Sequence, residues 1–183
     1  MKEEVIMAGF GGQGIMFAGQ LLAHAGMIEN KHVSWIPSYG PEMRGGTANV
    51  TVILSDERIS SPILTTFDTA IILNQQSMDK FESAVKPGGT LIYDPNGITR
   101  HPEREDIEVY RIAAAEEASN MGMNKVFNMV VLGGYLKVKP IVKMDNVVKG
   151  LKKSLPERYH HLLPMNEKAI KRGLEIVEEY KKN

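Results

Sequence analysis

The sequence contains no cysteine among its 183 residues, and this absence excludes several kinds of chemistry. No disulfide framework can form, and no thiol is present to act as a nucleophile. Iron–sulfur clusters are ordinarily held by cysteine thiolates, so we expect this chain to carry none. The absence is also compatible with a reducing cytoplasm.

Net charge and long apolar runs are lacking as well. Lys plus Arg and Asp plus Glu each number 22, so the formal net charge is zero. Binding to nucleic acid or to an anionic membrane by bulk electrostatics needs a basic excess, and we expect neither partner. No stretch approaches the ~20 apolar residues of a membrane span, and residues 1–8 do not read as a signal peptide. We therefore expect a cytoplasmic protein.

The pattern that is present indicates one α/β domain covering residues 1–183. Short apolar runs alternate with helical stretches, which is typical of a Rossmann-like, mostly parallel sheet with helices on both faces. The last third is predicted to be α-helical. The predicted strands cover 5–8, 32–36, 48–54, 67–73, 90–93 and 107–112, with a short return strand at 58–60. The predicted helices cover 15–25, 76–85, 113–120, 126–136, 144–155 and 164–180. Glycine and proline are expected to make 37–46 irregular, to end the first helix at Gly26 and, at 87–89, to break the helix predicted at 76–85.

A glycine loop follows the first predicted strand. Gly9, Gly11 and Gly14 satisfy the G-x-G-x-x-G pattern, with Gly12 and Gln13 between them. A tight turn leading into a helix N-terminus offers backbone N–H groups to an anion such as phosphate. Alternatively, the glycines only permit close packing of helix and strand.

Dinucleotide binding would need one more residue. An Asp or Glu at the end of the second strand normally holds the ribose hydroxyls. Here that strand runs into Pro37, Ser38 and Tyr39, and Glu29 comes before it. The sequence therefore weakens the prediction of an NAD site and leaves another anion open.

A second loop, at 38–46, is expected to lie beside the glycine loop at the carboxyl end of the sheet. Arg44 could hold a phosphate or carboxylate through two hydrogen bonds, or could pair with Glu42 to order the loop. The candidate ligand-facing residues are Gly9, Gly11, Gly12, Gln13, Gly14, Ser38, Tyr39, Glu42, Arg44, Gly45 and Gly46.

Other candidate residues are predicted to be structural. Asp94 precedes Pro-Asn-Gly and is expected to form a turn. Asn128 is expected to lie on an apolar helix. His160 and His161 lack a third ligand nearby, so no metal site is predicted. No catalytic residue can be assigned.

Three segments together resemble one family. They are 9–15 (GFGGQGI), 38–46 (SYGPEMRGG) and 128–134 (NMVVLGG). In this order they resemble the gamma subunit of 2-oxoacid:ferredoxin oxidoreductases, closer to the 2-oxoglutarate and ketoisovalerate types. The equivalent piece is the gamma-like domain of single-chain pyruvate:ferredoxin oxidoreductase.

The resemblance implies a subunit that completes an active site and is inactive alone. On this basis the loop at 38–46 could be a structural turn packed against a partner subunit, or could reach the shared active site and help to position coenzyme A. The complex would use thiamine diphosphate, Mg²⁺, 4Fe–4S clusters and coenzyme A, held on or with alpha, beta and ferredoxin-like delta subunits, and would reduce ferredoxin. The isolated chain could form a homodimer. The alternative is a stand-alone Rossmann-type nucleotide-binding domain or oxidoreductase using residues 9–14. The 2-oxoacid is not indicated by this sequence.

Overall fold

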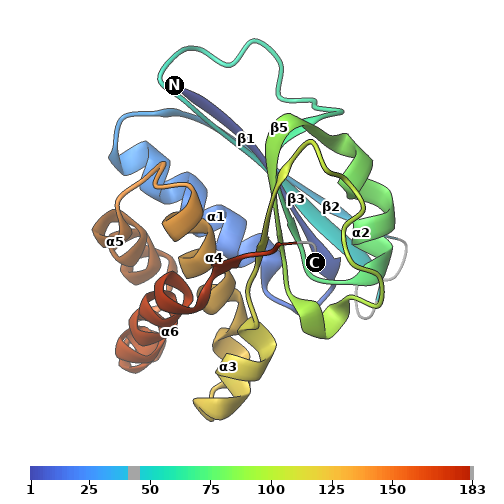
Figure 1. The fold of residues 1–183 in the computed structure, drawn as a ribbon. Helices are drawn as coiled ribbons and strands as arrows, with labels where there is room; N and C mark the ends of the chain where they lie inside the picture. The colour runs from blue at the N-terminus through green and yellow to red at the C-terminus, as the bar shows by residue number, and fades with distance from the viewer. Residues whose placement is uncertain (41–45, 182–183) are drawn as a thin grey trace.

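The computed structural model describes residues 1–40 and 46–181 (Figure 1). Six of its strands come first along the chain, with α1 and α2 between them, and a run of helices follows before the last short strand. The strands are β1 (Lys2–Phe10), β2 (His32–Tyr39), β3 (Thr47–Ser55), β4 (Phe67–Ile72), β5 (Val85–Tyr93), β6 (Glu108–Arg111) and β7 (Glu178–Glu179). The α-helices are α1 (Ile15–Ile28), α2 (Gln75–Phe81), α3 (Ala114–Asn120), α4 (Phe127–Val138), α5 (Met144–Ser154) and α6 (Leu163–Ile176). Short 3₁₀ helices are η1 (Glu82–Ala84), η2 (Pro95–Gly97), η3 (Asn124–Val126) and η4 (Glu157–Leu162).

The strands form one mixed sheet in the order β2-β3-β1-β4-β5-β6-β7. β1, β4, β5 and β6 are parallel neighbours, whereas β3 runs antiparallel to both β2 and β1, and β7 runs antiparallel to β6. The predicted mostly parallel α/β sheet is confirmed. The first three elements do not make a simple βαβ unit, however, because β3 is inserted between β1 and β2.

Helices cover both faces of the sheet, but unequally. α1, α4, α5 and α6 lie on one side and α2 on the other (Figure 1). Alternate residues of β1 serve the two cores: Val5 and Met7 pack under the larger helical layer, and Ile6 and Ala8 pack toward α2. This double burial explains why β1 reads as a continuous apolar run.

The predicted helical C-terminal third is also confirmed, with one correction at its end. α6 ends at Ile176 instead of reaching Tyr180, and the chain then adds the short strand β7. The Tyr180 ring stacks on His101, with 5.3 Å between ring centroids, and meets Tyr93 edge-on. These ring contacts favour an extended end to the chain over another helical turn.

Two further predictions near the N-terminal half were wrong. Gly26 does not end α1; it lies inside the helix, where a side chain would collide with Leu54 of β3. α1 instead stops before Asn30, whose φ of 57° is the left-handed conformation common just after helices. Residues 58–60 form no strand.

The prediction of irregular structure at 37–39 was wrong as well, and the helix predicted at 76–85 ends before 87–89, because Val85 already begins β5. Residues 37–39 continue β2, and Pro37 is tolerated there because β2 is the edge strand of the sheet. Val85 pairs with Phe67 and Thr90 with Thr69, so the residues between Val85 and Thr90 bulge out of the β4–β5 ladder. The bulge absorbs the Pro-Gly-Gly segment without ending β5.

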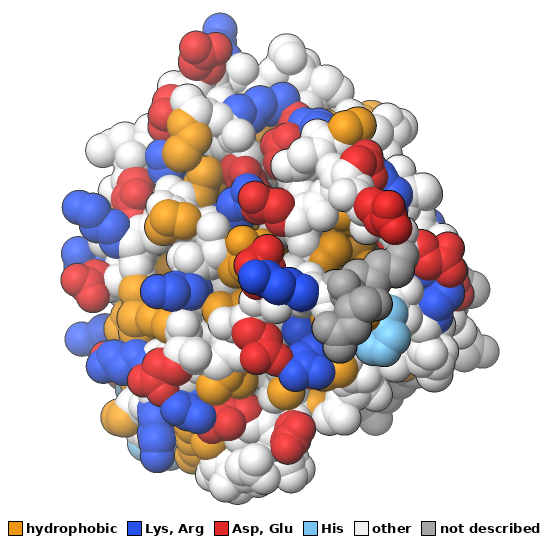
Figure 2. Space-filling view, in the orientation of Figure 1, with side chains coloured by type: hydrophobic (Ala, Val, Ile, Leu, Met, Phe, Trp, Pro, Cys, Tyr) orange, Lys and Arg blue, Asp and Glu red, His pale blue; other side chains and the backbone are white. Residues whose placement is uncertain are grey.

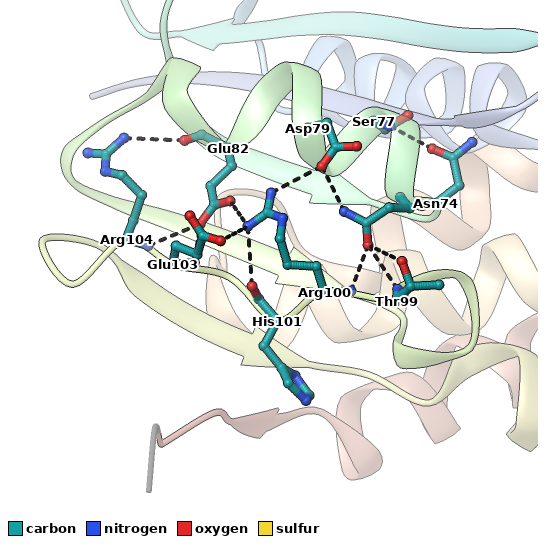
Figure 3. A network of polar contacts seen from close by, with 10 residues as sticks. Asn74, Ser77, Asp79, Glu82, Thr99, Arg100, His101, Glu103 and Arg104 are labelled. Carbon is teal, nitrogen blue, oxygen red and sulfur yellow. Dashed lines mark hydrogen bonds and ion pairs between the residues drawn. The ribbon is translucent and has the colours of Figure 1, made fainter.

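The polar segment after η2, residues 98–105, contains no helix or strand, and side chains of α2 and η1 hold it in place (Figure 3). The buried Glu82 carboxylate accepts hydrogen bonds from the backbone N–H groups of Glu103 and Arg104, at 2.5 and 3.0 Å. It also pairs with Arg100 at 2.9 Å. Because the carboxylate is paired and hydrogen-bonded, its burial is tolerated.

The surface matches the neutral composition. On the face drawn in Figure 2, basic and acidic side chains are interleaved, without a broad region of one sign. No helix among residues 1–40 and 46–181 is long and apolar enough to cross a membrane.

Close approach of two helices gives a test of the packing. A Cβ added at Gly133 of α4 would overlap the backbone carbonyl of Ile170 in α6, and one at Gly173 would overlap the carbonyl of Val130. We expect Gly133→Ala to lower the free energy of unfolding by about 3 kcal/mol, since backbone atoms must move apart. Lys137→Ala, at an exposed position of α4, should change it by less than about 0.5 kcal/mol. Urea denaturation of both variants measures the difference, and equal stabilities would contradict the packing argument.

Candidate functional site

The glycine loop leads from β1 directly into α1. Gly14 caps the helix with φ 76° and ψ 17°, a left-handed conformation that favours glycine. The N–H of Ala18 then donates to the Gly14 carbonyl at 3.0 Å and opens the helical hydrogen-bond pattern. The loop therefore presents the N-terminus of α1, with its partial positive charge, at the carboxyl end of β1.

Several polar groups of this loop are used to hold its own shape. The Gln13 side-chain oxygen accepts a hydrogen bond from the Phe10 N–H at 2.7 Å, and the Gln13 N–H donates back to the Phe10 carbonyl at 3.3 Å. The Gly11 N–H donates to the Gly46 carbonyl at 2.9 Å. Within the described part of the chain, the N–H groups of Gly12 and Gly14 have no such partner.

Of the other six predicted candidates, the structure describes three. Gly46 lies against Gly11, and Ser38 and Tyr39 end β2, two strands away from β1. Tyr39 is 49% exposed. The calls on Glu42, Arg44 and Gly45 lie outside the described residues.

A cavity of about 300 Å³ opens beside the glycine loop. One wall is formed by the loop itself, and the other by the start of α3, by η3 and by the start of α4. The lining residues are Gly12, Gln13, Gly14, Ala115, Asn124, Lys125 and Phe127. The sequence analysis missed the last four, because they lie over 100 residues from the loop. In an α/β sheet, ligands bind at the carboxyl ends of the strands, and this cavity is at that edge.

Asp94 supports the far wall. Its side chain is 1% exposed and accepts hydrogen bonds from the N–H groups of Asn96 and Ala115, both at 2.9 Å. It thereby fixes the turn after β5 and the start of α3, so the predicted turn-forming role is confirmed. Burial raises the pKa of Asp94 above its ordinary value, against the backbone hydrogen bonds that lower it.

Asn128 lies on the apolar helix α4, as predicted, and is buried. Its Nδ2 donates to the Gly14 carbonyl at 3.1 Å and so connects α4 to the glycine loop. The local sequence shows only an asparagine in an apolar helix, which gives no signal for a partner 114 residues away.

The two adjacent histidines belong to η4. A ring nitrogen of His160 donates to the Leu155 carbonyl at 2.8 Å, and one of His161 to the Arg158 carbonyl at 3.0 Å. Among residues 1–40 and 46–181, no group of three or more acidic or histidine side chains could hold a metal ion.

Comparison with known proteins adds a consistent set of likenesses. Residues 4–176 match the family described as pyruvate ferredoxin/flavodoxin oxidoreductase. The chain is 33% identical over 182 residues to the 2-oxoglutarate synthase subunit KorC of Methanocaldococcus jannaschii, covering 98% of this chain and 96% of the relative. The curated ketoisovalerate oxidoreductase subunits VorA that it matches are longer, and the chain spans only 27% and 35% of their lengths.

Two solved structures share the fold. One is the gamma subunit of a keto/oxoacid ferredoxin oxidoreductase from Geobacter sulfurreducens, with a TM-score of 0.83, 30% identity and 96% coverage of both chains. The other is a 2-oxoglutarate:ferredoxin oxidoreductase from Magnetococcus marinus with 2-oxoglutarate, coenzyme A and succinyl-CoA bound. Its TM-score is 0.87 at 25% identity, over 96% of this chain and 31% of that one.

The double capping by Asp94 gives a stability test. Asp94→Asn keeps the shape but leaves one acceptor oxygen, and its amide NH₂ would face a backbone N–H donor. We expect it to lower the free energy of unfolding by about 1–3 kcal/mol at neutral pH, measured by urea denaturation. Asp145→Asn, at an exposed position in the first turn of α5, is the matched control and should cost at most about 1 kcal/mol.

The pKa of Asp94 is raised in the folded state, so the difference in the free energy of unfolding between wild type and Asp94→Asn should depend on pH. Below its ordinary value of 3.8 the wild-type carboxyl is protonated in both states. As pH rises through the higher pKa of the folded state, wild type loses stability and the amide variant does not. The difference in the free energy of unfolding between wild type and Asp94→Asn should therefore become smaller as pH rises. A difference that grows with pH would contradict the argument that burial raises the pKa of Asp94.

Proposed function

Because the chain belongs to the pyruvate ferredoxin/flavodoxin oxidoreductase family and is of the gamma-subunit type, we propose that it completes the active site of a multisubunit 2-oxoacid:ferredoxin oxidoreductase. In that reaction the bond between the carboxylate and the oxo carbon breaks and releases CO₂. The acyl carbon joins the sulfur of coenzyme A, the thiol proton is released, and the electron pair passes to ferredoxin. The observation that carries this proposal is the match to gamma-type subunits over almost the whole chain.

The proposed role of this chain is to bind and orient coenzyme A. The cavity joins the N-terminus of α1 to Lys125, and its described lining residues include no carboxylate. The N–H groups of Gly12 and Gly14 add donors at the same place. These features favour an anion, and coenzyme A carries phosphate groups. Coenzyme A is much larger than the cavity, so one phosphate-bearing part would enter it and the remainder would lie against a partner.

Thiamine diphosphate, Mg²⁺ and 4Fe–4S clusters are assigned to the other subunits in this proposal. The sequence has no cysteine to hold a cluster. The alpha and beta subunits would carry the thiamine chemistry, and a ferredoxin-like delta subunit the clusters. The proposal also retains the predicted single domain and cytoplasmic location.

Exposed apolar side chains at one edge of the molecule support a subunit role. Met27 at the end of α1 is 62% exposed, and Trp35, Ile36 and Tyr39 of the edge strand β2 are also exposed. Met27 and Trp35 line the same surface pocket between α1 and β2, and apolar and aromatic side chains exposed together commonly mark a protein interface. The stand-alone nucleotide-binding alternative has no comparable support, because β2 ends without an acid that could hold a ribose.

Purification of the native protein tests the subunit role. We expect the chain to co-purify with thiamine-carrying and cysteine-rich partners. Coenzyme A-dependent oxidation of a 2-oxoacid should appear with the complex and be absent from the chain alone. A monodisperse chain that binds NAD(P) without partners would contradict the proposal and support the alternative.

Substitution of Lys125 tests the coenzyme A role. In the assembled complex, Lys125→Ala should raise the KM for coenzyme A about tenfold, corresponding to about 1.4 kcal/mol of lost binding. The KM for the 2-oxoacid should stay unchanged. Lys137→Ala removes the same charge elsewhere on the exposed surface and should leave both constants near wild type. Equal values for the two variants would refute an anion site at Lys125.

A further inference from the structure

A side-chain hydrogen bond links the two walls of the cavity. The glycine loop forms one wall, and residues 124–127 lead from the other into α4. Asn128, the second residue of α4, donates from Nδ2 to the carbonyl of Gly14 at 3.1 Å. Asn128 is itself only 8% exposed and is absent from the cavity lining, so it would act through the loop.

The bond reaches a glycine that is packed directly against the Asn128 side chain. A Cβ at Gly14 would lie 2.5 Å from Nδ2 of Asn128, so the amide fills the space beside the glycine. Gly14 is itself the left-handed N-cap of α1, and its carbonyl also accepts a hydrogen bond from the N–H of Ala18. α4 is buried along most of its length and therefore holds the Asn128 side chain in a fixed position.

The bond also sets the direction of the groups that face an anion. A trans peptide is planar, so its carbonyl and its N–H point in opposite directions. Holding the Gly14 carbonyl therefore orients the N–H of Ile15, and with it the first turn of α1. In a helix these N–H groups point out of the N-terminus, where an anion is stabilised.

We propose that Asn128 is a positioning residue, which holds the Gly14–Ile15 peptide so that the first N–H groups of α1 are aimed at the anionic part of coenzyme A. This inference rests on the proposed function and identifies a residue that sets the geometry of the same site without touching the ligand. It predicts that substitution of Asn128 changes the KM for coenzyme A more than it changes kcat.

Asn128→Asp in the assembled complex is the direct test. An ionised carboxylate has no proton to donate and would repel the Gly14 carbonyl, whereas the protonated acid could donate again. At neutral pH we expect the KM for coenzyme A to rise about tenfold, with kcat changed less than threefold. The ratio of variant to wild-type KM should fall toward one as pH falls. Taking the ratio at each pH removes the titrations that both proteins share.

The chain supplies a matched control at the other end of α1. Asn146, near the start of α5, is also 8% exposed and donates from Nδ2 to Glu29 at 2.8 Å. Asn146→Asp places a carboxylate against a carboxylate and should lower stability, while leaving the KM for coenzyme A near wild type. Hydrogen exchange of residues 11–18 in the complex should accelerate in Asn128→Asp and not in Asn146→Asp.

Asn128→Ala covers the case in which the charged variant does not assemble. It removes the donor without adding charge, so the KM for coenzyme A should rise at every pH, by a ratio that does not depend on pH. The inference is overturned if Lys125→Ala raises this KM and the Asn128 variants do not. It is also overturned if Asn146→Asp raises the KM equally. If neither Lys125→Ala nor the Asn128 variants change it, the proposed coenzyme A site itself is wrong.

Discussion

Helix α4 has to be enclosed on every side, and much of the architecture depends on this constraint. Nine of its twelve residues are buried, so the helix has almost no face left for water. The sheet lies beneath it, and α6 approaches so closely that Gly133 and Gly173 leave no room for side chains. The start of the same helix carries Asn128, which contacts the glycine loop. A helix required by the core therefore also supports the candidate site.

The parts of the fold that the sequence predicts are those determined by local patterns. Buried parallel strands such as β1 and β4 read as apolar runs because both their faces are covered. α5 shows the helical spacing of apolar residues that is typical of a half-buried helix. The strand at 48–54 was predicted and is β3, but its position between β1 and β2 could not be predicted, because strand order depends on pairing between distant segments. Pro37 and Pro87 gave misleading breaks, since an edge strand and a bulge accommodate the residues that usually interrupt strands.

The candidate site also contains residues that the sequence predicts and residues that only the fold identifies. The glycine loop is visible in the sequence because a left-handed cap such as Gly14 requires a particular residue type. Lys125 and Asn124 have no comparable signal: they are ordinary polar residues before a helix, and only the fold brings them to the loop. Asp94 was predictable as a turn residue, but its second hydrogen bond, to α3, was not. Local chemistry thus predicts one wall of the cavity, and tertiary structure supplies the other.

The insertion of β3 bears on how this fold could change during evolution. In dinucleotide-binding proteins, an acid after the second strand reaches the ribose of a nucleotide held at the glycine loop. Here β3 separates β2 from β1, which moves the end of β2 away by roughly another 4.8 Å strand spacing. An acid introduced at Ser38 or Tyr39 would still stand too far from the loop. Conversion of this domain to a nicotinamide-binding protein would require a rearranged sheet, and no single substitution provides one.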